Sequence, residues 1–262
     1  MRRTLKSAGD LAKFWASLLL FAVLGLIWSV VAIPAYLLLP RRLGARIGRL
    51  GFNRLSRLYV SWLALVNAYR LDLRGLDALA AGPAVILAPN HPSMIDAVLI
   101  MTCHPHIVCV MKAKIMNNVL LGSGARLARY ISNHPPRRMV LDAVAELQCG
   151  ESLLLFPEGT RTSSAPVNSF TTSAGLIAKR ARAPVQTLIV ETDSPYLGKG
   201  WSPFQRPVLP ITFRIRLGRR FEPPEDVRAF DTALEVYFRA ELDNSLQNEW
   251  LNARYPPRPG LR

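Results

Sequence analysis

The order of hydrophobic and polar positions divides this chain into two parts. Residues 14–39 form a stretch of 26 positions without a charge, and residues 41–69 mix apolar positions with arginines. From residue 70 onward, short apolar runs alternate with helical candidates. The first part is typical of a membrane segment, whereas the second is typical of a domain in which strands alternate with helices.

The pattern after residue 70 predicts an α/β fold with a mixed, mainly parallel sheet flanked by helices. The expected strands are 84–89, 106–112, 152–157, 185–191 and 211–218, and the expected helices lie near 92–103, 117–130, 138–148, 172–182 and 226–248. The last strand alternates apolar and charged residues, which indicates a half-exposed edge strand. We therefore divide the chain into an N-terminal membrane anchor with basic interfacial helices (1–69), an α/β domain (70–248) and a flexible tail (249–262).

The uncharged N-terminal stretch is long enough to enter a bilayer. Its residues would reach about 39 Å as a helix, more than the roughly 30 Å of the hydrocarbon core. We expect Pro34 to kink or end the first helix. Basic residues flank the stretch on both sides, so a single span would place one cluster outside, against the usual bias. A re-entrant segment or a two-helix hairpin keeps both clusters on one side. The sequence fits either a single-pass anchor or such a hairpin.

The segment that follows the uncharged stretch suits a helix in the headgroup layer. Residues 41–57 place arginines among apolar positions, namely Arg46, Arg49, Arg54 and Arg57. Such a composition is typical of helices that lie on an anionic membrane surface.

Charge supports a membrane partner rather than a nucleic acid. The chain has 33 Lys and Arg against 18 Asp and Glu, a net charge of +15, and half of its residues are hydrophobic. Up to residue 57, Asp10 is the only acidic residue against ten basic ones, so the excess lies beside the most apolar part of the chain. No nucleic-acid-binding motif occurs, and we expect no nucleic-acid partner.

Three scattered cysteines, Cys103, Cys109 and Cys149, do not form a disulfide framework. The stretch CHPHIVC, residues 103–109, has no second ligand pair elsewhere. We therefore interpret its cysteines as strand residues and expect no metal.

Two polar motifs follow predicted strands. Residues 90–96 read NHPSMID after the first strand, and residues 158–162 read EGTRT after the third. Because ligands bind beyond the carboxyl ends of parallel strands, the two motifs are expected to form one site.

The pair His91 and Asp96 has two interpretations. Ser93 and Asp96 match a capping box, in which His91 would have no special role. Alternatively, His91 lies in the turn before the helix, a position that Pro92 favours, and the Asp96 carboxylate orients its imidazole ring. A carboxylate on one ring nitrogen fixes the tautomer and leaves the other nitrogen to take a proton from a hydroxyl group.

Together the motifs resemble a known family. Asn90-His91-x4-Asp96 followed by Phe156-Pro157-Glu158-Gly159-Thr160-Arg161 is similar to the signature of the glycerolipid acyltransferases typified by 1-acylglycerol-3-phosphate acyltransferase. The resemblance covers about residues 70–200.

The resemblance implies transfer of an acyl group from acyl-CoA or acyl-carrier protein to a hydroxyl group of a lysophospholipid-type acceptor. His91 would be the general base and Asp96 would hold it. Arg161 would bind an anionic part of a substrate, and Glu158, Gly159 and Thr160 would shape the acceptor site. Asn90 and Ser93 are further candidate substrate-binding residues. No cofactor is expected, because a thioester is already activated.

The resemblance also implies membrane lipid and a thioester donor, possibly acyl-carrier protein, as partners. We expect the protein in the inner (cytoplasmic) membrane, with its α/β domain on the cytoplasmic face, where acyl thioesters are made.

The chain departs from the family at two cationic positions. A G-x-x-F-I-D-R-like strand is replaced by ARYISNHPPRR (128–138), in which Arg137 and Arg138 are candidate substitutes. An F-K-x-G block is replaced by FTTSAG (170–175), without the lysine. These losses suggest a second hypothesis, an acceptor lipid that lacks phosphate. A third hypothesis is a non-catalytic basic membrane protein that binds lipid.

Overall fold

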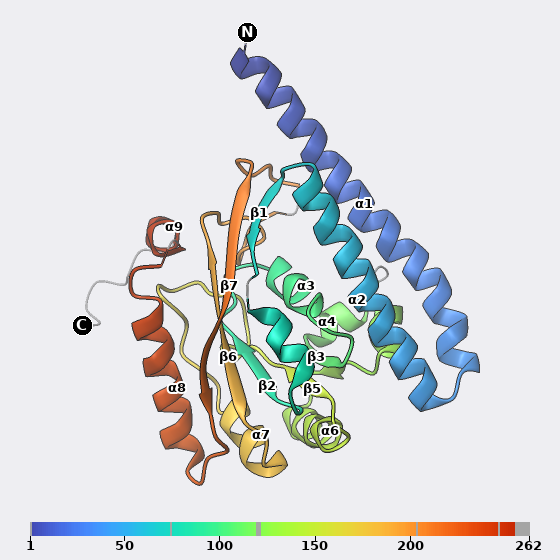
Figure 1. Cartoon of the computed structure of the whole chain (residues 1–262), viewed down its shortest axis with the longest axis vertical. Coiled ribbons are helices and arrows are strands. Elements are labelled where there is room, and N and C mark those ends of the chain that lie inside the picture. Colours follow the sequence, from blue (N-terminus) through green and yellow to red (C-terminus); the bar gives the residue numbers. More distant parts are fainter. Residues whose placement is uncertain (1, 74, 119–121, 203, 246, 255–262) are drawn as a thin grey trace.

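A mixed β-sheet forms the centre of the molecule (Figure 1). The computed structural model describes residues 2–73, 75–118, 122–202, 204–245 and 247–254. Within these residues the strands are β1 (Tyr69–Asp72), β2 (Ile86–Pro89), β3 (Ile107–Met111), β4 (Ile131–Ser132), β5 (Ser152–Leu154), β6 (Val185–Thr192) and β7 (Ile211–Phe221). Their order is β1-β7-β6-β2-β5-β3-β4, and only β6 and β7 pair antiparallel. The predicted mixed, mainly parallel sheet is confirmed.

The prediction that residues 211–218 form an edge strand is wrong. β1, which the sequence pattern did not reveal, pairs with β7 on its outer side. The alternation in β7 instead separates its two faces, because Ile211, Phe213 and Ile215 are buried while Arg214 points outward. β1 and β4 are four and two residues long and, unlike the equally short β2 and β5, do not lie in continuous apolar runs, since β1 reads YRLD and β4 reads IS.

Helices flank the sheet (Figure 1). They are α1 (Arg2–Leu38), α2 (Arg41–Leu65), the 3-10 helix η1 (Leu76–Ala81), α3 (Ile95–Met101), α4 (Ala113–Met116), α5 (Gly122–Leu127), α6 (Pro136–Gln148), α7 (Ser173–Ala181), α8 (Val227–Glu241) and α9 (Gln247–Arg254). The helix predicted over 226–248 ends at Glu241, and α9 extends into the predicted tail. Residues 255–262 lie outside the described residues.

The N-terminal part forms a helical hairpin against the domain. α1 and α2 run side by side in opposite directions, joined by a turn at Leu39 and Pro40 (Figure 1). Pro34 lies inside α1, so the helix continues beyond it to Leu38. Residues 8–38 of α1 are long and apolar enough to cross a membrane by length and composition. Its inner face is nevertheless buried against the protein, as at Phe14 and Ala32.

Not all of the arginines of α2 are available to a membrane surface, where the composition of the segment suggested that this helix lies. Arg49 is buried, and its guanidinium contacts Glu146 at 2.7 Å and Glu151 at 2.9 Å. Arg57 donates hydrogen bonds to the carbonyl oxygens of Thr102 and Cys103. One side of α2 therefore attaches the hairpin to the domain, while Arg46 and Arg54 remain exposed. A buried arginine is tolerated when carboxylates pair with its charge, and the sequence does not reveal which carboxylates those are.

Asp231 on α8 holds the start of α7 and gives the protein a pH-dependent stability. It accepts a hydrogen bond from the Gly175 amide at 3.0 Å, and burial raises its pKa from 3.8 to about 6. The folded protein therefore binds this proton more tightly than the unfolded chain, so stability is lost as pH rises from about 4 to about 6. We expect Asp231→Asn to remove this part of the slope. Denaturant unfolding across the window tests it, with half-buried Asp142→Asn as the control. An unchanged slope in Asp231→Asn would contradict the assignment.

Candidate active site

His91 lies in the turn between β2 and α3 and is oriented by a buried carboxylate. Its Nδ1 is 3.1 Å from Oδ2 of Asp96, and the same oxygen accepts the Ser93 amide at 2.9 Å. Asp96 thus makes the backbone contact of a capping box and also holds the imidazole. The Ser93 hydroxyl does not complete the capping box, since it donates to the carbonyl of Tyr196 at 2.8 Å.

Burial affects the protonation of Asp96. Desolvation raises the pKa of its carboxyl group, while the hydrogen bonds from His91 and the Ser93 amide act in the opposite direction. Above this raised pKa the carboxylate accepts the Nδ1 proton, and Nε2 becomes the nitrogen that can take a proton from a ligand.

Glu158 connects the second motif to the histidine turn. Its carboxylate accepts hydrogen bonds from the His91 amide at 2.9 Å, the Thr162 hydroxyl at 2.7 Å and the Asn168 amide at 2.9 Å. The Thr162 amide in turn donates to the His91 carbonyl at 2.7 Å. Burial raises the pKa of Glu158, and these bonds oppose the shift. Glu158 is not among the residues that line the cavity described below, so it positions the turn from behind.

Two further contacts fix the turn. The side-chain amide of Asn90 both donates to and accepts from the backbone of Val190, each at 2.8 Å, which ties the turn to β6. The ring of Phe156 stacks on the imidazole with centroids 3.8 Å apart. Asn90 and Ser93 are fully buried and bonded to backbone, so the structure places them behind the cavity wall rather than on it.

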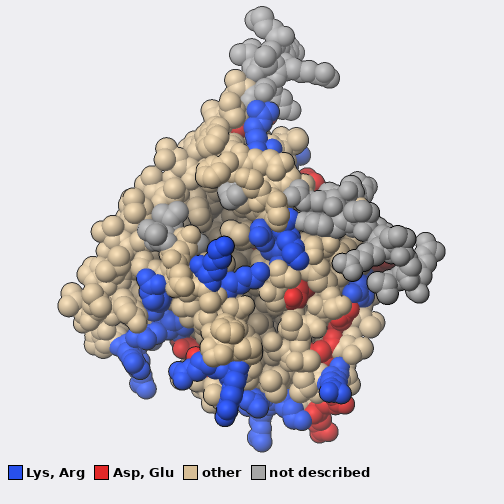
Figure 2. All heavy atoms as spheres, turned by 180° about the vertical axis from the view of Figure 1, so that it is seen from behind, with Lys and Arg blue, Asp and Glu red and all other residues tan. Residues whose placement is uncertain are grey.

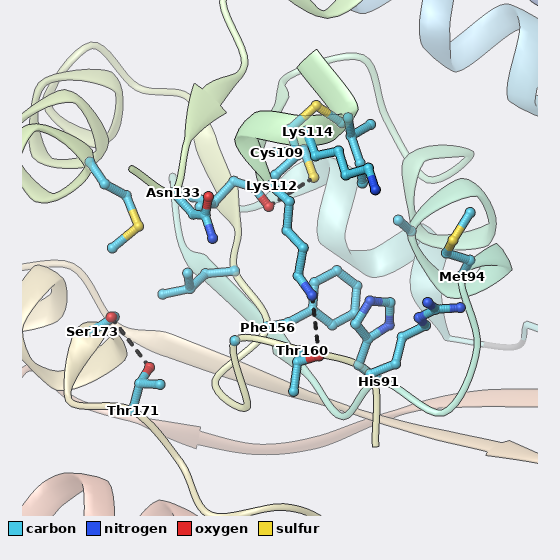
Figure 3. A pocket seen from close by; sticks show the side chains of 18 of the residues that line it. His91, Met94, Cys109, Lys112, Lys114, Asn133, Phe156, Thr160, Thr171 and Ser173 are labelled. Carbon is cyan, nitrogen blue, oxygen red and sulfur yellow. Dashed lines mark hydrogen bonds between the residues drawn. The ribbon is translucent and has the colours of Figure 1, made fainter. Parts of the chain in front are cut away.

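A cavity of about 580 Å³ opens beside His91 (Figure 3). One group of lining residues is apolar: Met94, Ala97, Val110, Ile115, Met139 and Leu155. Another is cationic: Lys112, Lys114 and Arg161. The cavity is therefore amphipathic, with the imidazole on its wall. On the face of the molecule shown in Figure 2, Lys and Arg side chains gather around a central hollow.

The cationic side chains lie close enough to influence one another. The Lys112 ammonium group contacts the Thr160 hydroxyl at 3.2 Å (Figure 3). Burial, followed by the positive charges of Arg161 and Lys199, lowers the pKa of Lys112. A bound anion would relieve this repulsion, so the arrangement favours an anionic ligand group. The Arg161 guanidinium also donates to the carbonyls of Leu197 and Gly198, at 2.8 and 2.9 Å.

Arg137 and Arg138 are not brought into the cavity. Both are exposed at the start of α6, and Arg138 pairs with Asp142 at 2.9 Å. Lys112 and Lys114, which the sequence interpretation missed, take the cationic positions instead. A signal for them existed, because they directly follow β3, which pairs in parallel with β5, the strand that precedes the second motif.

The buried cysteine of the cavity wall is poorly suited to act as a nucleophile. Cys109 lines the cavity, but burial raises the pKa of its thiol to about 12, so it stays neutral. Within the described ranges, no three His, Cys, Asp or Glu side chains gather closely enough to hold a metal ion.

The fold and the cavity define an α/β protein in which a His–Asp pair faces a space suited to a ligand with one charged and one apolar part. The family described as Acyltransferase matches residues 70–191 of this chain. It also resembles the crystal structure of the 1-acyl-sn-glycerophosphate (LPA) acyltransferase PlsC from Thermotoga maritima. The TM-score is 0.65 and the identity 18%, over 98% of this chain and 100% of that one. No curated protein has a significantly similar sequence.

Proposed function

We propose that the protein transfers an acyl group from a thioester, acyl-CoA or acyl-carrier protein, to a hydroxyl group of a lysophospholipid-type acceptor. The observation that carries the proposal is the hydrogen bond between His91 Nδ1 and buried Asp96 on the wall of an amphipathic cavity. The family and the fold shared with a lysophosphatidate acyltransferase support it.

The reaction needs only the histidine pair and the two substrates. His91 Nε2 accepts the proton of the acceptor hydroxyl group while the hydroxyl oxygen bonds to the carbonyl carbon of the thioester. The π electrons of that carbonyl group move to the carbonyl oxygen. When the carbonyl re-forms, the C–S bond breaks, and the sulfur leaves with the electron pair and takes the proton from the imidazolium. The Asp96 carboxylate stabilises that imidazolium in between.

The cations beside His91 favour an acceptor that carries phosphate. The sequence hypothesis of a phosphate-free acceptor depended on two missing cations. Lys112 and Lys114 supply positive charge to the same cavity from a different strand, together with Arg161. The departures from the family motifs therefore do not leave an uncharged acceptor site.

Acceptor choice is tested by Lys112→Met. Loss of one charged hydrogen bond of about 1.5–3 kcal/mol lowers kcat/KM for lysophosphatidate about 10- to 100-fold. Monoacylglycerol, which has no phosphate, should react equally well with both proteins. Acyl transfer assays with each acceptor in the same vesicles measure this, with Lys179→Met on α7 as a control outside the cavity. Wild-type preference for monoacylglycerol would instead support the phosphate-free acceptor.

We place the α/β domain on the cytoplasmic face of the inner membrane. The apolar helix α1 supports membrane association, and thioester donors are made in the cytoplasm. Protease cleavage of the domain in inverted but not in right-side-out membrane vesicles would support this orientation.

A further inference from the structure

The connection between β6 and β7 exposes two large apolar side chains. Phe204 is 68% exposed and Val208 is 89% exposed, on either side of the exposed Arg206. Exposed apolar residues are ordinary when they are scattered singly, so their surroundings decide whether these two have a role.

Alternate residues of the same segment anchor it to the hairpin. Pro207 and Leu209 are buried, and with Phe14 of α1 and Tyr196 they line a small cavity between the segment and α1. The segment is thus held from within while Val208 faces away. Because Pro207 and Leu209 on either side of it are buried, the side chain of Val208 points outward.

Phe204 continues an apolar row on α1. Its ring stacks on Trp15, with centroids 6.4 Å apart and planes 25° apart. Trp15 belongs to a series of exposed apolar residues at helical spacing: Leu11, Trp15, Leu19, Val23, Leu26, Val30, Ile33 and Leu37. At about 1.5 Å per residue this row is about 39 Å long. Phe204 is therefore part of a continuous exposed apolar face.

The base of the same segment is bonded to both motifs of the active site. The Leu197 carbonyl accepts hydrogen bonds from the Met94 amide at 3.1 Å and from the Arg161 guanidinium. The neighbouring Tyr196 carbonyl accepts the Ser93 hydroxyl. Because the base of the segment is bonded to the active-site motifs, a surface bound by residues 204–209 would lie at a fixed distance from the cavity.

We propose that residues 204–209 form, with the outward row of α1, one surface that contacts the lipid bilayer. Phe204 and Val208 enter the apolar layer, and Arg206 lies at the headgroups. The segment is a second membrane contact besides the helical hairpin, and it sets the orientation of the α/β domain on the membrane. With the domain held at two places, the active site keeps one orientation relative to the membrane surface.

A bilayer fits this face better than a protein does. The row is long and apolar, and the adjoining helix α2 carries exposed arginines, Arg41, Arg42, Arg46 and Arg54. Apolar side chains beside basic ones match the acyl and anionic headgroup layers of a bilayer. The net charge of +15 acts in the same direction.

Spin labels at single cysteines test the proposal on the full-length protein. Cys103 and Cys109 are buried and only Cys149 is exposed, so Cys149→Ser gives a background for labelling. In that background we place labels at Phe204→Cys and Val208→Cys. Leu19→Cys on α1 is the positive control, and Val236→Cys on α8, also exposed, is the negative control. Collision rates with oxygen and with a water-soluble nickel complex are compared in phosphatidylcholine–phosphatidylglycerol vesicles.

Labels at 204 and 208 are expected to resemble the label at 19, with oxygen collisions far exceeding nickel collisions, whereas the label at 236 should collide mainly with nickel. Labels at 204 and 208 that behave like 236 overturn the proposal. It is also overturned if the label at 19 stays in water. Line broadening that grows with protein concentration in detergent would assign the face to a second copy of the chain. None of these outcomes depends on acyl transfer.

Discussion

Replacement of His91 by alanine is expected to lower kcat for acyl transfer about 10²–10⁴-fold, the usual contribution of a general base. KM for the acceptor should change little, because Lys112 and Arg161 remain in the cavity. The variant removes the only imidazole on the cavity wall among the described lining residues. Initial rates at saturating thioester, followed by release of the free thiol, measure the loss.

The control for this variant is His106→Ala. It removes another histidine, whose side chain is 58% exposed and is not among the residues that line the cavity. Thermal unfolding of both variants shows whether the fold is kept. Two results would contradict the proposal. Full activity of His91→Ala would exclude its role as the base. A wild-type protein that binds the acceptor without transferring an acyl group would support the hypothesis of a non-catalytic lipid-binding protein.

Local sequence predicted the elements that the histidine depends on. The run that precedes residue 90 is a buried strand, Pro92 separates it from α3, and Asp96 lies in the first turn of that helix. These features act over a few residues, so spacing and residue type were sufficient. The meeting of the two motifs was predicted because both follow strands of a mainly parallel sheet, and the structure pairs β2 with β5.

The features that sequence could not predict depend on long-range pairing. Glu158 supports the His91 backbone across 67 positions, and Arg49 meets Glu146 across 97. Periodicity carries no information about which distant carboxylate meets a given donor. Lys112 was overlooked for a related reason: positive charge was sought where the family motifs place it, whereas the fold brings it from the end of β3.

Asp96→Asn is expected to lower kcat about 10²–10⁴-fold while leaving the shape of the turn intact. Asparagine can still accept the Ser93 amide through its carbonyl oxygen. The same carbonyl oxygen can also accept the Nδ1 proton, because a single oxygen of Asp96 makes both contacts, and the NH₂ group then takes the position of Oδ1. The neutral amide has no negative charge to stabilise the imidazolium that forms when His91 takes the acceptor proton, so the rate falls.

The double variant gives the sharpest result for this pair. If Asp96 acts through His91, adding Asp96→Asn to His91→Ala should cause almost no further loss, because residues that act as a unit are non-additive. If the losses multiply, Asp96 has a separate structural role, as the capping-box interpretation implies. Asp142→Asn on α6 serves as the matched control.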